Sequence, residues 1–290
     1  MLIQQIVNGL TIGGVYALIA MGLAMVYGIL RIIHVAHAGV YVVGAYAGLY
    51  TYILTHSFIL SIVSSMVAGA LIGILIQKYV YFPLIKHSPI ISLIASIGLF
   101  ISIEESMRLI FGPYIKSFPK DLFKGEYHLG SVVIGQSQLV VVFISVTAIA
   151  IIWYVTQKTR FGLALKAVSQ DIDTAETLSI DSKRIISTAF AFGSALAGLA
   201  GLLVGAYFNS VFSSMGDVPA YKALAIIVVG GMGNIWGAFA ASIAVGLIET
   251  LSIGVLNVPL PRNSLAFIFM IIVLLFKPEG IAGLFKGFGK

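Results

Sequence analysis

Apolar runs of about twenty residues, the length that crosses a bilayer as a helix, follow one another along most of the sequence. No charged residue precedes Arg31, and only 10% of the 290 residues are charged whereas 59% are hydrophobic. A soluble domain has roughly 25% charged residues, so no soluble fold of this length could bury so much apolar surface. Strands of a membrane barrel alternate apolar and polar residues, and these runs do not. The sequence therefore predicts an all-α integral membrane protein, a polytopic helical bundle.

Hydropathy predicts about nine membrane-spanning helices, within a range of eight to ten because several runs are short or interrupted by glycine. The expected spans are roughly 3–30, 37–54, 58–82, 90–111, 138–157, 185–207, 218–233, 236–255 and 263–276. We expect residues 1–290 to form a single transmembrane domain, with an external loop at 112–137 and a cytoplasmic helix at about 160–182. The segment EYHLGSVVIG in the external loop is expected to form a small hairpin.

Lysine and arginine indicate the orientation, because cytoplasmic loops carry them in excess. If 158–184 is cytoplasmic, 11 Lys and Arg residues fall inside and six, Lys222 among them, fall outside. This distribution predicts an external N-terminus and a cytoplasmic C-terminus; the family resemblance described below implies the cytoplasmic (inner) membrane. The distribution also accounts for the net charge of +6, which in a soluble protein could indicate nucleic acid binding. The chain has no cysteine, which excludes disulfides and thiolate metal sites.

Small residues recur at a spacing of four along the expected sixth span. Gly193, Ala197, Gly201 and Gly205 share one face of that helix. Such a face lets helix backbones approach closely, which is a main source of helix association in lipid. We expect these four residues to serve helix packing, and we assign them no chemistry.

A polar segment, KAVSQDIDTAETLSIDSKRI (166–185), carries four of the eleven acidic residues. Val168, Ile172 and Ala175 are spaced at i, i+4 and i+7, which predicts an amphipathic helix with Asp171, Asp173 and Glu176 on its polar side. One interpretation is a solvated loop helix. The other is a docking element that presents an apolar ridge and an acidic flank to a soluble partner. We call residues 160–182 the cassette.

Polar residues inside expected spans are costly and therefore informative. Asn8, Thr11 and Tyr16 lie on the first span, and His34 and His37 follow it. Two histidines at i, i+3 could ligate a metal, but no Asp, Glu or Cys lies nearby in sequence, so we expect a packing or interfacial role, or a place at a lumen between the spans. No metal site and no cofactor are expected.

Two further features are candidates for the path. In the sequence GGMGN, Gly230, Gly231, Gly233 and Asn234 break an apolar run. A broken helix survives in a membrane where it lines a cavity or is buried in protein, and half-helices can hold a zwitterion. The orientation favours the simpler alternative, a tight cytoplasmic turn. Glu249 is alone in the eighth span and must find a partner or face water.

Four stretches resemble the permease subunits (H-type) of branched-chain amino acid ABC transporters. They are TRFGLALKAVSQD with A-x-x-L-S-I-D and F-x-x-G-S-A-L-A-G-L-A-G, NGLTIGGVYALIAMGLAMVYGILRIIHVAHAG, YKALAIIVVGGMGNIWGA and FKPEG. The stretches occur along the chain in the same order as in the family, and the resemblance covers nearly the whole chain. The resemblance implies a type II-like ABC importer permease whose cassette is the coupling helix. The family usually has Gly where this chain has Ser179, so the turn there is less certain.

The resemblance assigns contact with the ATPase to the cassette. The residues concerned are Arg160, Val168, Asp171, Ile172, Asp173, Ala175, Glu176, Ser179 and Ile180. It implies four kinds of partner: a second homologous permease subunit in a heterodimer, two ATP-binding cassette subunits, and an extracytoplasmic solute-binding protein. No P-loop sequence is present, so the chain is expected to be a transport subunit rather than an enzyme.

The implied solutes are Leu, Ile and Val. Related permeases carry urea or short amides, which stays an alternative. A second alternative is a stand-alone secondary amino-acid transporter, which normally needs ion-coupling carboxylates in its spans. A membrane-embedded enzyme is disfavoured, because neither G-x-S-x-G nor H-E-x-x-H occurs.

Overall fold

The computed structural model describes residues 2–85, 87–119, 122–123, 125–129, 132–255, 261–277 and 280–281. Its helices are α1 (Leu2–Leu30), α2 (His37–Thr55), α3 (Phe58–Ile76), α4 (Phe82–Leu84), α5 (Pro89–Phe111), α6 (Gln136–Lys158), α7 (Arg160–Gln170), α8 (Ile172–Thr177), α9 (Ser182–Tyr207), α10 (Asp217–Gly230), α11 (Ile235–Gly254) and α12 (Arg262–Phe276). A π-helical turn, η1 (Gln77–Tyr81), joins α3 to α4, and a 3₁₀ turn, η2 (Ser213–Gly216), precedes α10. The expectations that involve Lys86, Lys120, Lys124, Lys286 and Lys290 lie outside the described residues.

Seven helices in the described part of the chain are long and apolar enough to cross a membrane. They match the expected spans at α1, α2, α3 with α4, α5, α6, α9 and α11. The two other expected spans are also helices, but α10 has 14 residues and α12 has 15. Both are shorter than the ~20 residues of a full crossing. The expected range 218–233 was too long because Gly231, with a φ of 96°, ends α10.

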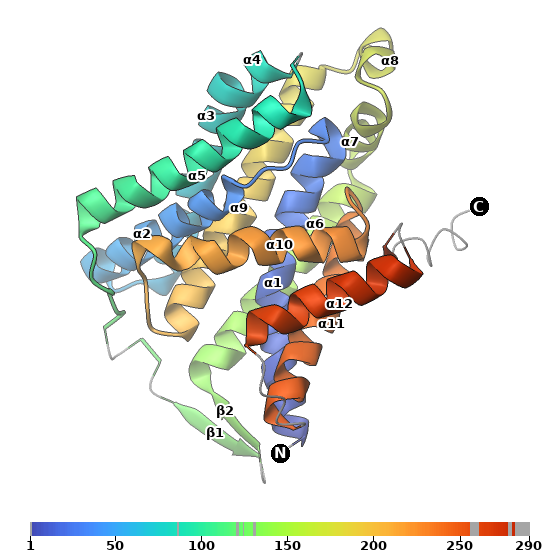
Figure 1. Cartoon of the computed structure of the whole chain (residues 1–290). Coiled ribbons are helices and arrows are strands. Elements are labelled where there is room, and N and C mark those ends of the chain that lie inside the picture. The colour runs from blue at the N-terminus through green and yellow to red at the C-terminus, as the bar shows by residue number, and fades with distance from the viewer. Residues whose placement is uncertain are drawn as a thin grey trace.

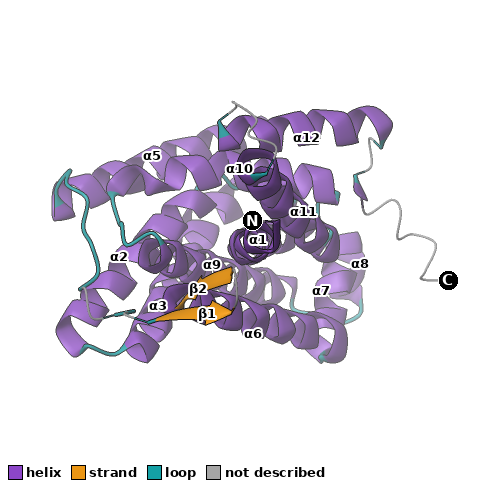
Figure 2. Ribbon diagram, turned by 90° about the horizontal axis from the view of Figure 1, so that it is seen from below, coloured by secondary structure: helices purple, strands orange, loops and turns teal. Residues whose placement is uncertain are grey.

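Helix α1 occupies the centre of the bundle. Seen from below, it is surrounded by α2, α9, α6, α11 and α10 (Figure 2). Glycines allow the close approach. A Cβ added at Gly13 would lie 3.1 Å from the Cα of Ile243 on α11, and one added at Gly22 would lie 2.6 Å from the carbonyl oxygen of Gly193 on α9. The packing of α1 therefore depends on small residues, as expected for helices that associate in lipid.

Helix α9 packs against three neighbours through its small residues. Gly193 meets Gly22 of α1, and a Cβ at Gly201 would collide with the carbonyl oxygen of Tyr41 on α2. Gly198, which the four-residue spacing did not include, faces the carbonyl oxygen of Ser65 on α3. Gly198 also lies against Gly44 of α2, whereas Gly205 faces Val211 in the segment after α9 and not a neighbouring helix.

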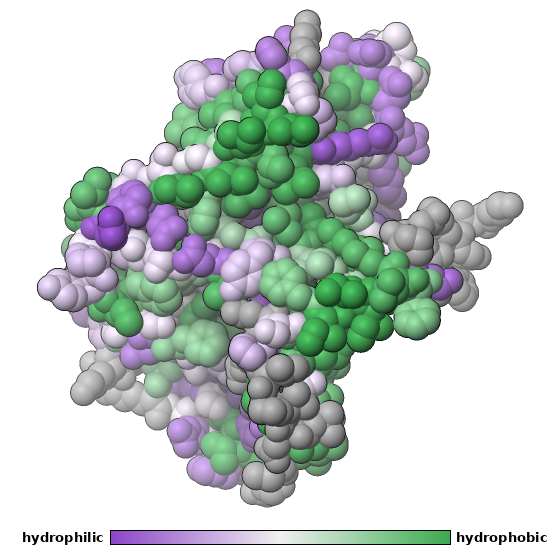
Figure 3. Space-filling view, viewed as in Figure 1, coloured by the Kyte–Doolittle hydropathy of each residue, from purple (hydrophilic) through white to green (hydrophobic). Residues whose placement is uncertain are grey.

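The two ends of the bundle differ in character. The N-terminus and the hairpin of β1 (Glu126–Leu129) and β2 (Val132–Gly135) lie at one end, and α7 and α8 lie at the other (Figure 1). The predicted hairpin is confirmed, with antiparallel pairing of Glu126 with Gly135 and Leu129 with Val132. Hydrophilic residues gather over α7 and α8, whereas apolar residues cover α5 and α12 between the ends (Figure 3). This distribution is that of a protein whose middle faces lipid or other membrane helices.

Candidate functional site: a cavity with a buried ion pair

A cavity of about 470 Å³ lies in the half of the bundle nearest the hairpin. Its wall is mostly apolar, and its residues come from α1, α2, the end of α9, η2 and α10: Thr11, Ile12, Val15, Tyr16, Ile19, Tyr41, Val204, Tyr207, Phe208, Ser210, Phe212, Met215, Val218, Pro219, Lys222, Ala223 and Ile226. The segment after α9 is held in place by Val211, which forms a β-bridge with Lys116 of the loop before the hairpin. A largely apolar cavity with few polar groups is the usual form of a small-molecule site.

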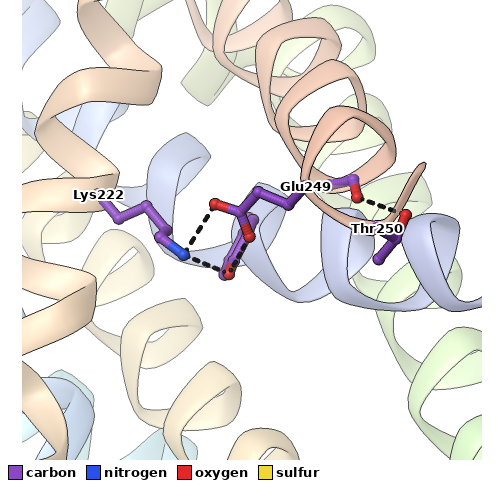
Figure 4. Close-up of polar contacts among 5 residues, drawn as sticks. Lys222, Glu249 and Thr250 are labelled. Atoms are coloured by element: carbon purple, nitrogen blue, oxygen red, sulfur yellow. Dashed lines mark hydrogen bonds and ion pairs between the residues drawn. The ribbon is translucent and has the colours of Figure 1, made fainter. Parts of the chain in front are cut away.

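Three polar side chains from three helices meet at this wall (Figure 4). Lys222 of α10 and Glu249 of α11 point toward each other, with Nζ 2.8 Å from Oε1. The hydroxyl of Tyr16 on α1 accepts a hydrogen bond from Lys222 Nζ at 2.8 Å and donates one to Glu249 Oε2 at 3.1 Å. Lys222 is 3% exposed and Glu249 is 1% exposed. The three groups form a triangle inside the bundle.

The triangle satisfies charges that would otherwise be costly in a membrane interior. The Lys222 ammonium also lies 4.8 Å from the centre of the Tyr16 ring, where the face of the ring attracts a cation. On the far side of Glu249, Thr250 turns its hydroxyl to the carbonyl oxygen of Gly246 at 2.9 Å. Lys222 and Tyr16 belong to the cavity wall, and Glu249 stands behind them.

The sequence indicated that Glu249 needs a partner but did not identify Lys222 as that partner. Lys222 lies within the expected span 218–233 and was counted with the external residues. The structure buries its side chain in α10, at the cavity in the half of the bundle nearest the hairpin. The available signal was a single lysine in an otherwise apolar run, YKALAIIVVGG.

Asn8 and Thr11 face α6. Gln138 of that helix donates hydrogen bonds to Asn8 Oδ1 at 3.1 Å and to Thr11 Oγ1 at 3.0 Å. Of the two, Thr11 also contributes to the cavity wall. Gln138 is a buried polar residue that sequence reasoning did not single out, since it begins the apolar run of the fifth span.

His34 and His37 are buried in a separate cluster. His34 Nδ1 lies 2.6 Å from the hydroxyl of Tyr81, and His37 Nε2 lies 3.2 Å from the carbonyl oxygen of Ile19. The two rings are 5.4 Å apart. Neither side chain is in the wall of the cavity. No group of three or more His, Cys, Asp or Glu residues that could hold a metal occurs in the part of the chain described.

The GGMGN sequence forms a turn between α10 and α11. Asn234 Oδ1 accepts hydrogen bonds from the backbone N–H of Trp236 at 3.0 Å and Gly237 at 2.9 Å, which starts α11. Gly233 lies against Gly28 at the end of α1. Gly233 and Asn234 line a second cavity, of about 350 Å³, which α7 also borders. The turn is therefore at the α7–α8 end of the bundle, away from the ion pair.

The cassette is two helices and not one, which corrects the sequence prediction. The chain is extended at Asp171, with φ −156° and ψ 118°, so α7 ends there and α8 begins. Asp171 Oδ1 accepts a 2.6 Å hydrogen bond from the backbone N–H of Thr174. This hydrogen bond, made to the charged carboxylate, lowers the pKa of Asp171 below its usual range. The side-chain cap at Asp171 therefore ends one helix and starts the next, although the apolar residues keep a helical spacing across the break.

The break changes which residues are available to a partner. Val168 and Ala175, expected on the docking ridge, are buried within the chain, at 1% and 2% exposure. Ile172 and Ile180 are partly buried. Of the residues expected to contact the ATPase, Arg160, Asp171, Asp173, Glu176 and Ser179 are exposed, and the leucines Leu163 and Leu178 are 68% and 69% exposed. The exposed surface of the cassette thus includes charged groups and two leucines.

Ser179 closes α8 in a left-handed conformation, with φ 63°. Its backbone N–H donates to the carbonyl oxygen of Glu176 at 3.0 Å, and the N–H of Ile180 donates to that of Ala175 at 3.1 Å. This pair of bonds is a Schellman motif, in which glycine is the usual left-handed residue. Asp181 then caps α9 by accepting from the N–H of Arg184 at 3.0 Å. The turn is well formed even though a serine occupies the glycine position.

Residues 5–276 match the family described as "Branched-chain amino acid transport system / permease component". The chain belongs to this family. Two curated members are similar over almost their whole length. "High-affinity branched-chain amino acid transport system permease protein LivH" of Escherichia coli (strain K12) is 32% identical over 97% of this chain and 95% of its own. The corresponding permease protein BraD of Pseudomonas aeruginosa is 31% identical with the same coverage.

A solved structure shares the fold of this permease. PsaBC from Streptococcus pneumoniae, solved in complex with a Fab, superposes with a TM-score of 0.53 over 94% of this chain and 91% of that chain, at 14% identity. The protein is therefore a multi-pass membrane permease of the helical-bundle class, and the family describes it as one component of a transport system. Both the cavity and the cassette lie within the matched residues.

Proposed function

We propose that the chain is a transmembrane permease subunit of an ABC importer for branched-chain amino acids, Leu, Ile and Val. Family membership supports a permease component, and the names of LivH and BraD support the solute class. The complex contains a second, homologous permease chain, two ATP-binding cassette subunits and an extracytoplasmic solute-binding protein. The hairpin end faces outward and the cassette faces the cytoplasm.

The observation that carries the proposal is the cavity near the hairpin. Its wall is apolar over most of its extent, and its polar groups converge at Lys222 and Tyr16. A branched-chain amino acid matches this wall, because it has a charged head for the polar groups and an apolar tail for the rest of the surface. The cavity is therefore a suitable chamber for a solute released by a binding protein at the outer face.

The cassette supplies the place where an ATPase acts. It projects at the end opposite the hairpin, with an exposed charged face and the leucines Leu163 and Leu178. A closing ATPase dimer that pushes α7 would also push the turn between α10 and α11, because both border the second cavity. Helices α10 and α11 carry Lys222 and Glu249, so motion at the cassette reaches the wall of the outer cavity.

The second permease chain would cover part of the apolar surface. Exposed isoleucines follow one face of α5 and part of α12: Ile90, Ile94, Ile97, Ile101, Ile268, Ile271 and Ile272. A heterodimer that packs these faces together would place the cavities of the two chains near a common axis. The translocation path then lies at or near the junction of the two permeases.

The test is reconstitution of the chain with its candidate partner subunits in proteoliposomes. Uptake of labelled leucine should require ATP and the binding protein, and it should stop with an ATPase variant that binds but does not hydrolyse ATP. Uptake of urea instead of leucine would move the solute assignment to the amide class. Leucine uptake by this chain alone, driven by an ion gradient, would show a secondary transporter and refute the proposal.

A further inference from the structure

The ion pair at the cavity wall has an arrangement that stability alone does not explain. Its three groups come from α1, α10 and α11, and the charged atoms are almost completely buried. Replacing a buried ion pair by apolar residues of similar size is often neutral or stabilising. A bundle that needed only packing at this point would be served equally well by two apolar side chains.

The placement of the pair relative to the cavity indicates a use. Lys222 and Tyr16 are in the wall, so the cation is the first charge that a solute in the cavity meets. Glu249 is directly behind, 2.8 Å from the Lys222 ammonium and 3.1 Å from the Tyr16 hydroxyl. The site thus holds one positive and one negative group side by side. These charges are complementary to the carboxylate and the ammonium of an α-amino acid.

We propose that Lys222, Glu249 and Tyr16 form the binding site for the zwitterionic head of the solute, an inference that rests on the proposed function. On binding, the Lys222 ammonium turns from Glu249 to the solute carboxylate. The Glu249 carboxylate, which lies behind Lys222 in this structure, thereby opens to the solute ammonium. The Tyr16 hydroxyl stays between them as donor and acceptor. The apolar tail lies against the wall formed by Ile12, Val15 and Ile226.

Electrostatics explains why this site selects a zwitterion. Before binding, Lys222 and Glu249 neutralise each other, and after binding each is paired with the opposite charge of the solute. The net charge in the low-dielectric interior is zero in both states. A carboxylate without an ammonium, or an amine without a carboxylate, would leave one uncompensated charge there, which is strongly unfavourable. A neutral solute would have to separate Lys222 from Glu249 without supplying a charge to pair with either of them, which is also unfavourable.

The decisive experiment uses the whole reconstituted transporter and the double variant Lys222→Met with Glu249→Gln. The variant removes both charges together, so no lone buried charge remains. We expect ATP-driven leucine uptake to fall at least tenfold while the complex still assembles and its thermal unfolding midpoint in detergent does not fall. Leucine uptake at the wild-type rate by an assembled double variant would overturn the inference.

A matched control is available on α5. Arg108 and Glu105 form an ion pair of similar length, 2.6 Å, but their side chains are 55% and 45% exposed. Replacing Arg108→Met with Glu105→Gln makes the same chemical change outside the cavity, and leucine uptake should be unchanged. An equal fall in the control would mean that loss of any ion pair harms the protein, and would also contradict the inference.

A second variant covers the case in which the double variant does not assemble. Tyr16→Phe removes one hydroxyl and keeps the ring and both charges. It should lower leucine uptake about fivefold with normal assembly, and unchanged uptake would overturn the inference. Failure of the proposed function is a separate result, because then the wild-type complex itself takes up no leucine in response to ATP.

Discussion

The centre of the bundle and the cassette keep their shapes by different means. At the centre, α1 and α9 touch through glycines, and the two buried charges are satisfied by residues far apart in sequence. In the cassette, α7 and α8 are short. Asp171 caps the start of α8, Ser179 closes its end and Asp181 caps the start of α9, all through hydrogen bonds within three to five residues. Tertiary contacts alone hold the first region, whereas the cassette combines buried residues such as Val168 and Ala175 with local caps at its helix ends.

This difference separates the tasks of the two regions. The central helices keep two charged groups buried and paired, because an unsatisfied charge inside a membrane is costly. The cassette exposes a polar surface at the end of the bundle, where capped short helices suffice. Substitutions should accordingly have large effects at the centre and small ones at the caps.

The largest effect is expected from Lys222→Met alone. The substitution leaves Glu249 as a buried carboxylate without its cation, and breaking a buried pair in this way costs about 3–5 kcal/mol. The folded yield and the thermal unfolding midpoint in detergent should drop sharply. The double variant that also carries Glu249→Gln should regain the wild-type midpoint, because no lone buried charge remains. A single variant as stable as the double variant would contradict the charge pairing at the centre.

Gly201→Leu should be nearly as damaging, with a cost of about 3 kcal/mol. Even a Cβ at this position would collide with the carbonyl oxygen of Tyr41, so α9 and α2 must separate. Gly98→Leu on α5 is the matched control, because no heavy atom lies within 4 Å of a Cβ added there. Detergent thermal melts of both variants measure the difference. Equal melting of the two would mean that the α9–α2 contact is not close.

The sequence predicted the parts of this molecule that depend on periodicity and local chemistry. The apolar runs located the long helices, and EYHLGSVVIG located the hairpin. The pairing of Lys222 with Glu249 was not accessible, because the two residues are on different helices and nothing local links them. The break at Asp171 was accessible in principle, since Asp is a favoured N-cap residue. It was missed because Val168, Ile172 and Ala175 keep a helical spacing across Asp171, which predicts one continuous helix.

Ala175→Arg tests the corrected view of the cassette. Ala175 is 2% exposed, so the arginine would have no room and should unfold α8 locally at a cost of about 2–3 kcal/mol. Leu178→Arg makes the same change at a residue that is 69% exposed. Limited proteolysis should cut the cassette of the first variant and spare that of the second, while both lose ATPase association. Equal resistance of both cassettes to the protease would contradict the burial of Ala175.

The cap at Asp171 predicts a modest dependence on pH. Its folded-state pKa is lowered by the hydrogen bond from the N–H of Thr174, so the charged cap stabilises α8 above the ordinary aspartate pKa of about 3.9. That stabilisation is lost as the pH falls through the lower, folded-state value. Protease sensitivity of the cassette should therefore rise on acidification, and Asp171→Asn should remove this part of the response. An unchanged acid response in the Asn variant would mean that another group causes it.

The smallest effect is expected from Ser179→Gly. Serine at φ 63° strains the backbone by about 1 kcal/mol, and glycine adopts this conformation freely. Part of the gain is offset because glycine loses more freedom on folding, so the cassette should become more stable by about 0.5 kcal/mol. Ser179→Val should do the opposite, since a β-branched residue is poorly tolerated at positive φ. Hydrogen exchange at the amides of Ser179 and Ile180, which close the Schellman motif, measures both effects. If the glycine variant exchanged faster than wild type, the serine hydroxyl, and not the backbone turn, would be what holds the end of α8.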